Sequence, residues 1–131
     1  MGKPIVRLML ATFATFVTAS QLALASALQF VCTYPKHFDW KDAKLDEASD
    51  FVLSFSFDAQ NKQAFLTDKQ GTEEVNFVSG AAGITFIEVL PTGAIQTTTV
   101  SKDGKSVHSR NTIVLGKLVP SQYFGECTSS N

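Results

Sequence analysis

The chain is poor in cysteine, histidine and net charge, and each shortage excludes a class of protein. Its two cysteines and two histidines are too few and too scattered for a structural zinc site. A formal net charge of −1 without any basic run gives no electropositive surface for a nucleic acid. After residue 27, no apolar stretch is long enough to cross a bilayer as a helix. We therefore expect no metal, no cofactor, no nucleic-acid partner and no membrane span in residues 28–131.

The first 27 residues have the organisation of a secretory signal peptide. Lys3 and Arg7 form a positive region, a mainly apolar run follows, and small residues at 25–27 match a signal-peptidase site. A membrane-anchoring helix is the alternative, although Thr and Ser interrupt the run. We expect cleavage after Ala27, which leaves residues 28–131 as a single secreted domain. The expected compartment is the bacterial periplasm.

The two cysteines lie near opposite ends of the expected domain. In an exported protein, the pair Cys32 and Cys127 predicts a disulfide bond. Their spacing is unlike the Cys-x-x-Cys motif of redox-active pairs. On the chain-entropy model, a disulfide that closes a loop of about 100 residues stabilises a domain by about 4–5 kcal/mol.

Short alternating segments predict an antiparallel all-β fold. The clearest covers residues 51–58, where Phe51, Leu53, Phe55 and Phe57 alternate with polar residues. We count seven or eight such strands, and no helical segment is long enough for a parallel crossover. The expected architecture is a small meander barrel or a curled β-sandwich stapled by the disulfide.

The most charged stretch, residues 36–50, is the one place where a helix is expected. Pro35 should end the first strand, which covers residues 28–34. Asp39 is a suitable N-cap for a short helix over residues 40–48, with acidic residues in its first turns. Such a helix would plug one end of the β-structure, and an irregular loop is the alternative.

Residues 84–114 predict a three-stranded meander with a defined register. Pro91-Thr92-Gly93 and Lys102-Asp103-Gly104 each suit a type I turn followed by a glycine at positive φ. This pairing brings one set of side chains to a single face: Ile84, Phe86, Glu88, Gln96, Thr98, His108 and Arg110. A one-residue slip at the second turn would move His108 and Arg110 to the other face.

The polar members of that face form the first candidate site. If the face lines an interior, Arg110 would anchor an anion, held by Glu88 and Gln96, with His108 as a titratable neighbour. The alternative is an ordinary cross-strand ion pair on a solvated face. This site predicts a non-catalytic binding module for a small amphipathic or anionic ligand.

A second candidate site lies in the loops and predicts a protein-binding or inhibitory module. Phe38 and Trp40 are aromatic residues in a charged segment, and Ser79 and Gly80 open a flexible turn. The alternative for Trp40 is that its ring covers the core. An envelope enzyme is the remaining alternative. It finds no catalytic pair, because His108 and its sequence neighbour serine must point to opposite faces of a strand.

In outline, the ends of the domain resemble the periplasmic inhibitors of C-type lysozyme. The shared features are Phe30-Val31-Cys32 at the start, Gly125-Glu126-Cys127 at the end, and a serine- and glycine-containing turn at residues 79–83. The resemblance implies a small exported β-domain that binds another envelope protein. The aromatic, lysine-glycine segment that the family carries after this turn is absent here, so no functional residue is transferred.

Overall fold

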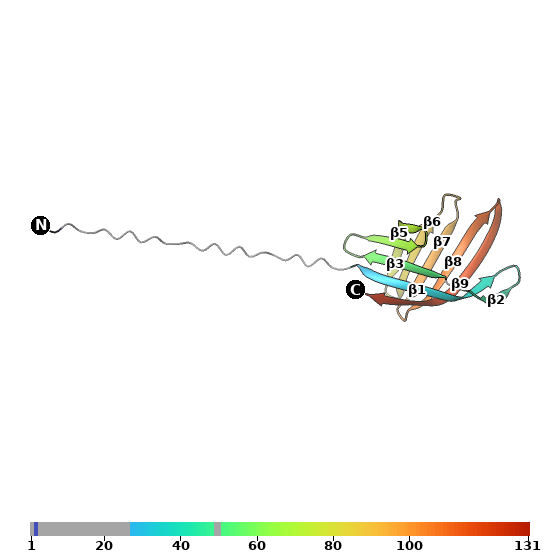
Figure 1. The fold of residues 1–131 in the computed structure, drawn as a ribbon, viewed down its shortest axis with the longest axis horizontal. Coiled ribbons are helices and arrows are strands. Elements are labelled where there is room, and N and C mark those ends of the chain that lie inside the picture. The colour runs from blue at the N-terminus through green and yellow to red at the C-terminus, as the bar shows by residue number, and fades with distance from the viewer. Residues whose placement is uncertain (1, 3–26, 49–50) are drawn as a thin grey trace.

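The structure is a computed structural model that describes residues 2, 27–48 and 51–131, and its strands form a closed antiparallel barrel (Figure 1). The described residues contain nine strands: β1 (Leu28–Asp39), β2 (Lys44–Glu47), β3 (Val52–Asp58), β4 (Gln63–Asp68), β5 (Gly71–Gly80), β6 (Gly83–Val89), β7 (Ile95–Ser101), β8 (Lys105–Val114) and β9 (Lys117–Ser130). The predicted signal peptide, residues 1–27, lies almost entirely outside this part. In the described part, no helix has the length and apolarity needed to cross a membrane.

The barrel is an up-and-down meander that closes where its last strand meets its first. Each strand from β3 to β8 pairs with the next in sequence, β1 pairs with β3, and β9 pairs with β1 over most of its length. Eight strands therefore form the barrel, and β2 pairs only with the extension of β1. The predicted all-β class and the disulfide are confirmed, and the barrel, rather than the sandwich, is the form that occurs.

The two ends of the barrel differ in what they carry. We call one the termini end, because β1 begins and β9 ends there, together with the turns at 59–62, 81–82 and 102–104. The opposite hairpin end carries two projecting β-hairpins, one formed by β1 and β2 and the other by β8 and β9 (Figure 1).

The segment after Pro35 was predicted wrongly. Strand β1 continues through Pro35 to Asp39, because a bulge between Thr33 and Lys36 accommodates the residue that cannot donate to the ladder. Residues 40–47 form a turn and β2 instead of a short helix. Asp39 does cap this turn, since its carboxylate accepts a hydrogen bond from the Lys41 amide at 2.8 Å.

The predicted register of the central meander is confirmed. Residues 84–114 form β6, β7 and β8, and the turns at 91–93 and 102–104 close as expected, with Gly93 and Gly104 both at φ 85°. The inner face carries the predicted set of side chains, and Phe86, Thr98 and His108 on it are almost completely buried. The hydrophobic core thus fills the barrel interior.

A close contact between backbones seals the barrel. A Cβ atom at Gly125 of β9 would lie 1.9 Å from the carbonyl oxygen of Thr33 on β1, so only glycine fits there. The Cys32–Cys127 disulfide joins directly opposed residues of the same two strands. The two features together fix the seam between β1 and β9.

Candidate functional site

The first set of predicted site residues lies together inside the barrel, towards the hairpin end. Glu88 on β6 is opposite Gln96 on β7, and Gln96 is opposite Arg110 on β8, so the three form one row. His108 lies one step along, opposite Thr98. The grouping follows from the confirmed register, whereas a binding role for these residues stays a prediction.

Very little space remains around this row. The cavity that Glu88, Gln96, Thr98 and His108 line has a volume of about 10 Å³, and aromatic and aliphatic side chains close it. A cavity of this size holds about one water molecule at most. This cavity beside Glu88, Gln96 and His108 therefore has no room for an organic ligand.

His108 is a hydrogen-bonded core residue. Its Nδ1 atom lies 2.7 Å from the hydroxyl oxygen of Thr98, and the rings of Tyr34, Phe51 and Tyr123 surround it at centroid distances of 6.0, 5.3 and 6.1 Å. Burial, together with the nearby positive charge of Arg110, lowers the pKa of His108 to about 4. The side chain is thus neutral near pH 7.

Arg110 and Glu88 do not form the expected ion pair. No ion pair within 4.0 Å joins Arg110 to another described residue, and its guanidinium carbon lies 5.9 Å from the ring centre of Tyr123. Burial raises the pKa of Glu88 to about 7, with smaller contributions from the Glu73 carboxyl and the Asp68 charge, while Arg110 acts in the opposite direction. At the hairpin end, no ion pair therefore joins Arg110 to the carboxyl groups of Glu88, Glu73 or Asp68.

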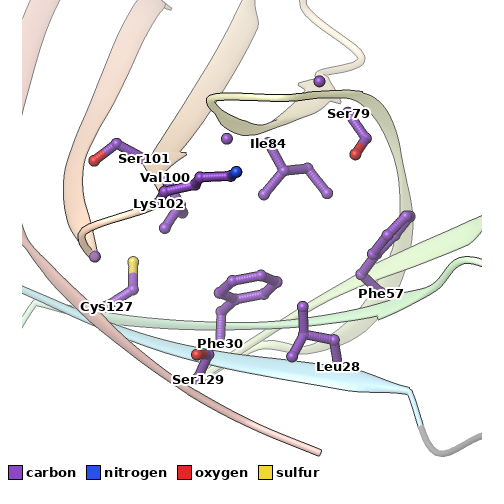
Figure 2. Close-up of a pocket in the computed structure, with 13 residues that line it drawn as sticks. Leu28, Phe30, Phe57, Ser79, Ile84, Val100, Ser101, Lys102, Cys127 and Ser129 are labelled. Atoms are coloured by element: carbon purple, nitrogen blue, oxygen red, sulfur yellow. The ribbon is translucent and has the colours of Figure 1, made fainter.

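The termini end, in contrast, is open and holds a cavity of about 250 Å³, which we call the cup (Figure 2). Its floor is apolar and comes from four strands, with the side chains of Leu28, Phe30, Phe57, Ile84 and Val100. The rim is formed largely by small residues of the surrounding turns and of the end of β9. Phe30, Ile84 and Val100 also belong to the buried core, so the floor is continuous with the centre of the barrel.

One cation stands over this apolar floor. The side chain of Lys102 extends from the turn between β7 and β8 across the cavity towards Ile84 (Figure 2). No carboxylate lines the cup, and no described residue forms an ion pair with Lys102. The neighbouring carboxylate of Asp103 instead accepts hydrogen bonds from the Ser101 hydroxyl and the Lys105 amide. The cup therefore combines apolar surface with one uncompensated positive charge.

The backbone holds this lysine in place. The amide of Lys102 donates a hydrogen bond of 3.1 Å to the carbonyl of Ala82, which joins the turn at 102–104 to the turn at 81–82. Gly83 sits at the contact between them, because a Cβ there would lie 2.2 Å from the carbonyl oxygen of Val100. The two turns form one rigid side of the rim.

The second set of predicted residues is divided between two places. Ser79 and Gly80 line the cup, whereas Phe38 and Trp40 line a separate groove on the outer wall at the hairpin end. Trp40 does not cover the core, because 52% of its surface is exposed. Among the described residues, no group of three or more His, Cys, Asp or Glu side chains is placed to hold a metal ion.

Apart from Ser79 and Gly80, the residues of the cup were not predicted as a site from the sequence, although a signal for them existed. Strand alternation places Phe30, Phe57 and Val100 on inner faces. In an up-and-down meander, alternate turns lie at the same end, so Lys102 must lie near the turn at 81–82. The first predicted site instead consists of polar residues inside the strands, which lie towards the hairpin end.

Comparisons with known proteins give no further assignment. No protein-family model matches the chain, and no curated protein or solved structure matches it either. Inferences about function therefore rest on the geometry of the barrel itself.

Proposed function

We propose that the chain is a non-catalytic binding module that holds a small amphipathic ligand with an anionic head group in the cup. The observation that carries the proposal is the uncompensated Lys102 ammonium above a floor of five apolar side chains. An alkyl or aromatic tail would cover that floor, and a carboxylate or similar head would lie beside the lysine. As part of the same proposal, residues 1–27 direct the module to the cell envelope.

The size of the cup limits the ligand. Its volume of about 250 Å³ lies just below the range of about 300–1,000 Å³ that is typical of pockets for drug-sized molecules. A medium-chain carboxylate matches this volume and its polarity, whereas a whole phospholipid is too large. Because the cup is open at the rim, the head group keeps contact with water and the ammonium group needs only partial desolvation.

Calorimetric titration of the purified chain with octanoate tests this function. We expect saturable binding, and Lys102→Ala should weaken it about tenfold, which corresponds to about 1.4 kcal/mol. Octyltrimethylammonium should bind more weakly than octanoate, because its head group repels Lys102. The matched control is Lys69→Ala, which removes a lysine from a turn at the hairpin end. Equal affinity of wild type and Lys102→Ala for octanoate would refute the proposed role of the lysine.

A second variant tests the apolar floor separately. Ser79→Trp should occupy the cup with an indole ring, since Ser79 lines the cup, lies opposite Ile84 and is exposed. We expect this variant to lose octanoate binding while its backbone amide spectrum keeps the dispersion of a folded barrel. If the folded variant binds octanoate as well as wild type does, the ligand lies elsewhere and the proposal is wrong.

A further inference from the structure

The outer wall of the barrel carries a second concave feature, which we call the Trp40 groove. It has a volume of about 190 Å³ and lies over β1, β9 and β8 at the hairpin end. One row of outward side chains consists of Phe38, Gln122 and Ser109, which are paired across the three strands. The next row contains Asn111 opposite a proline of β9, with Trp40 directly after the end of β1.

The lining of this groove has an unusual composition for a protein surface. Two aromatic rings stand beside uncharged amide and hydroxyl groups, and the one charged residue that lines it, Arg110, carries its guanidinium beside the Tyr123 ring. Ser109 and Gln122 hydrogen-bond to each other at 3.2 Å. Trp40 keeps 52% of its surface exposed, although it is the largest apolar side chain of the protein.

This lining fits a saccharide better than another protein. A protein interface buries an apolar patch at its centre, whereas here the polar side chains of Gln122 and Ser109 follow Phe38 in one row across the groove. A pyranose ring has an apolar face of C–H groups that packs on an aromatic ring, and a perimeter of hydroxyls that need both donors and acceptors. Side-chain amides supply both kinds of group, and they carry no charge.

We propose that the Trp40 groove binds an uncharged oligosaccharide, with one sugar ring packed on Trp40 and its hydroxyls bonded to Gln122 and Asn111. The groove is smaller than a pocket for a compact drug-sized ligand, and it is open to solvent. It therefore holds about one sugar ring at a time, and the rest of the oligosaccharide continues along the outer wall of the barrel. The site is separate from the cup, so the module has two binding sites for two classes of ligand.

The chain supplies its own reporter for this site, because Trp40 is its single tryptophan. The experiment is a titration of the purified, disulfide-bonded protein with chitotetraose, cellotetraose and maltotetraose, with tryptophan fluorescence as the readout. We expect at least one of these to shift the emission of Trp40 saturably, with a dissociation constant in the range of about 0.1–10 mM. The absence of a shift with all three overturns the proposal.

Two variants and a control define the site. Gln122→Ala keeps the reporter and should weaken the active tetrasaccharide about five- to tenfold, because the hydroxyls lose an amide partner. Trp40→Ala, followed by calorimetry, should remove detectable binding. Leu115→Ala is the matched control, since Leu115 is an apolar residue with 97% of its surface exposed outside the groove. Binding by Trp40→Ala with the affinity of wild type would overturn the proposal.

A protein ligand would give a different pattern. If an envelope protein shifts the Trp40 emission and none of the three tetrasaccharides does, the groove is a protein interface and the saccharide proposal is wrong. Octanoate serves as the check on independence, because its binding in the cup should be unaffected by Gln122→Ala.

Discussion

The two ends of the barrel interior have opposite character. Towards the hairpin end the inner face is polar and aromatic, and it is filled around His108, where the cavity measures about 10 Å³. At the termini end the inner face is apolar and open, with a cavity of about 250 Å³. Polar residues in the middle of a strand form a recognisable pattern for a candidate site. The sequence therefore predicts a site at the filled end.

The difference follows from side-chain size. An eight-stranded barrel is just wide enough for its own side chains to fill. Tyr34, Phe51 and Tyr123 extend into the hairpin end, and their rings pack at centroid distances of 5.4 Å and 4.4 Å. At the termini end the rim carries Gly80, Gly83 and serine residues, which leave the space unoccupied. Polar side chains are therefore used for packing at one end, and apolar side chains remain available to a ligand at the other.

The largest expected effect concerns the seam beside the cup. Replacing Cys32 and Cys127 together with alanine should destabilise the protein by about 4 kcal/mol, because the disulfide closes a loop with a sequence separation of 95 residues. Urea denaturation at pH 7 measures the loss, and the reduced wild-type protein is the control. Since Cys127 also lines the cup, octanoate binding should fall in parallel. A loss of stability below about 1 kcal/mol would show that the seam is held by pairing alone.

An intermediate effect tests whether the hairpin end is structural. Thr98→Val removes the hydroxyl that pairs with Nδ1 of His108 and leaves a buried polar atom without a partner, which costs about 1–3 kcal/mol. Thr99→Val is the control, because the Thr99 hydroxyl meets only that of Thr85 on the exposed outer face. It should change stability by about 0.5 kcal/mol or less. Both variants should bind octanoate like wild type, and equal destabilisation by the two would contradict the comparison.

The smallest effect is a pH dependence at the same end. The pKa of Glu88 is raised to about 7 in the folded protein, from an ordinary value of 4.5. Folding therefore favours the protonated form, and the stability this provides at low pH is lost as the pH rises from about 4.5 to 7. The measurement is the difference in urea midpoint between Glu88→Gln and wild type. This difference should favour the variant more at pH 8 than at pH 5.

The matched control for this pH effect is Glu74→Gln, since Glu74 is exposed and outside the cavity that Glu88 lines. The pH dependence of the Glu88→Gln effect should exceed that of the Glu74→Gln effect. The lowered pKa of His108 gives an opposite trend, a loss of stability as the pH falls from about 6.5 to 4, but it is present in every variant and cancels in the comparison. A pH-independent difference for Glu88→Gln would show that Glu88 is solvated in the folded state.

Most of the barrel was predictable because local rules decide it. Strand alternation predicted which side chains of the central meander point into the barrel. The turns that end in glycines 93 and 104 predicted how its strands pair. The helix predicted after Asp39 was wrong because propensity in a short charged segment is weak, and pairing with β1 outweighs it. Pro35 did not end β1, since a bulge between neighbouring residues accommodates it.

The sequence by itself determined the all-β class and the disulfide partners, and it favoured the observed register of residues 84–114. Each depends on the alternation of side chains along a strand, on turn chemistry or on the number of cysteines. These properties can be read from the sequence alone. Only the tertiary structure decided that the sheet closes, that Lys102 stands above an open apolar cup, and that Gln96 and His108 lie in a filled interior. The reason is that empty space depends on side chains from strands far apart in the sequence, and no local pattern records how they fit together.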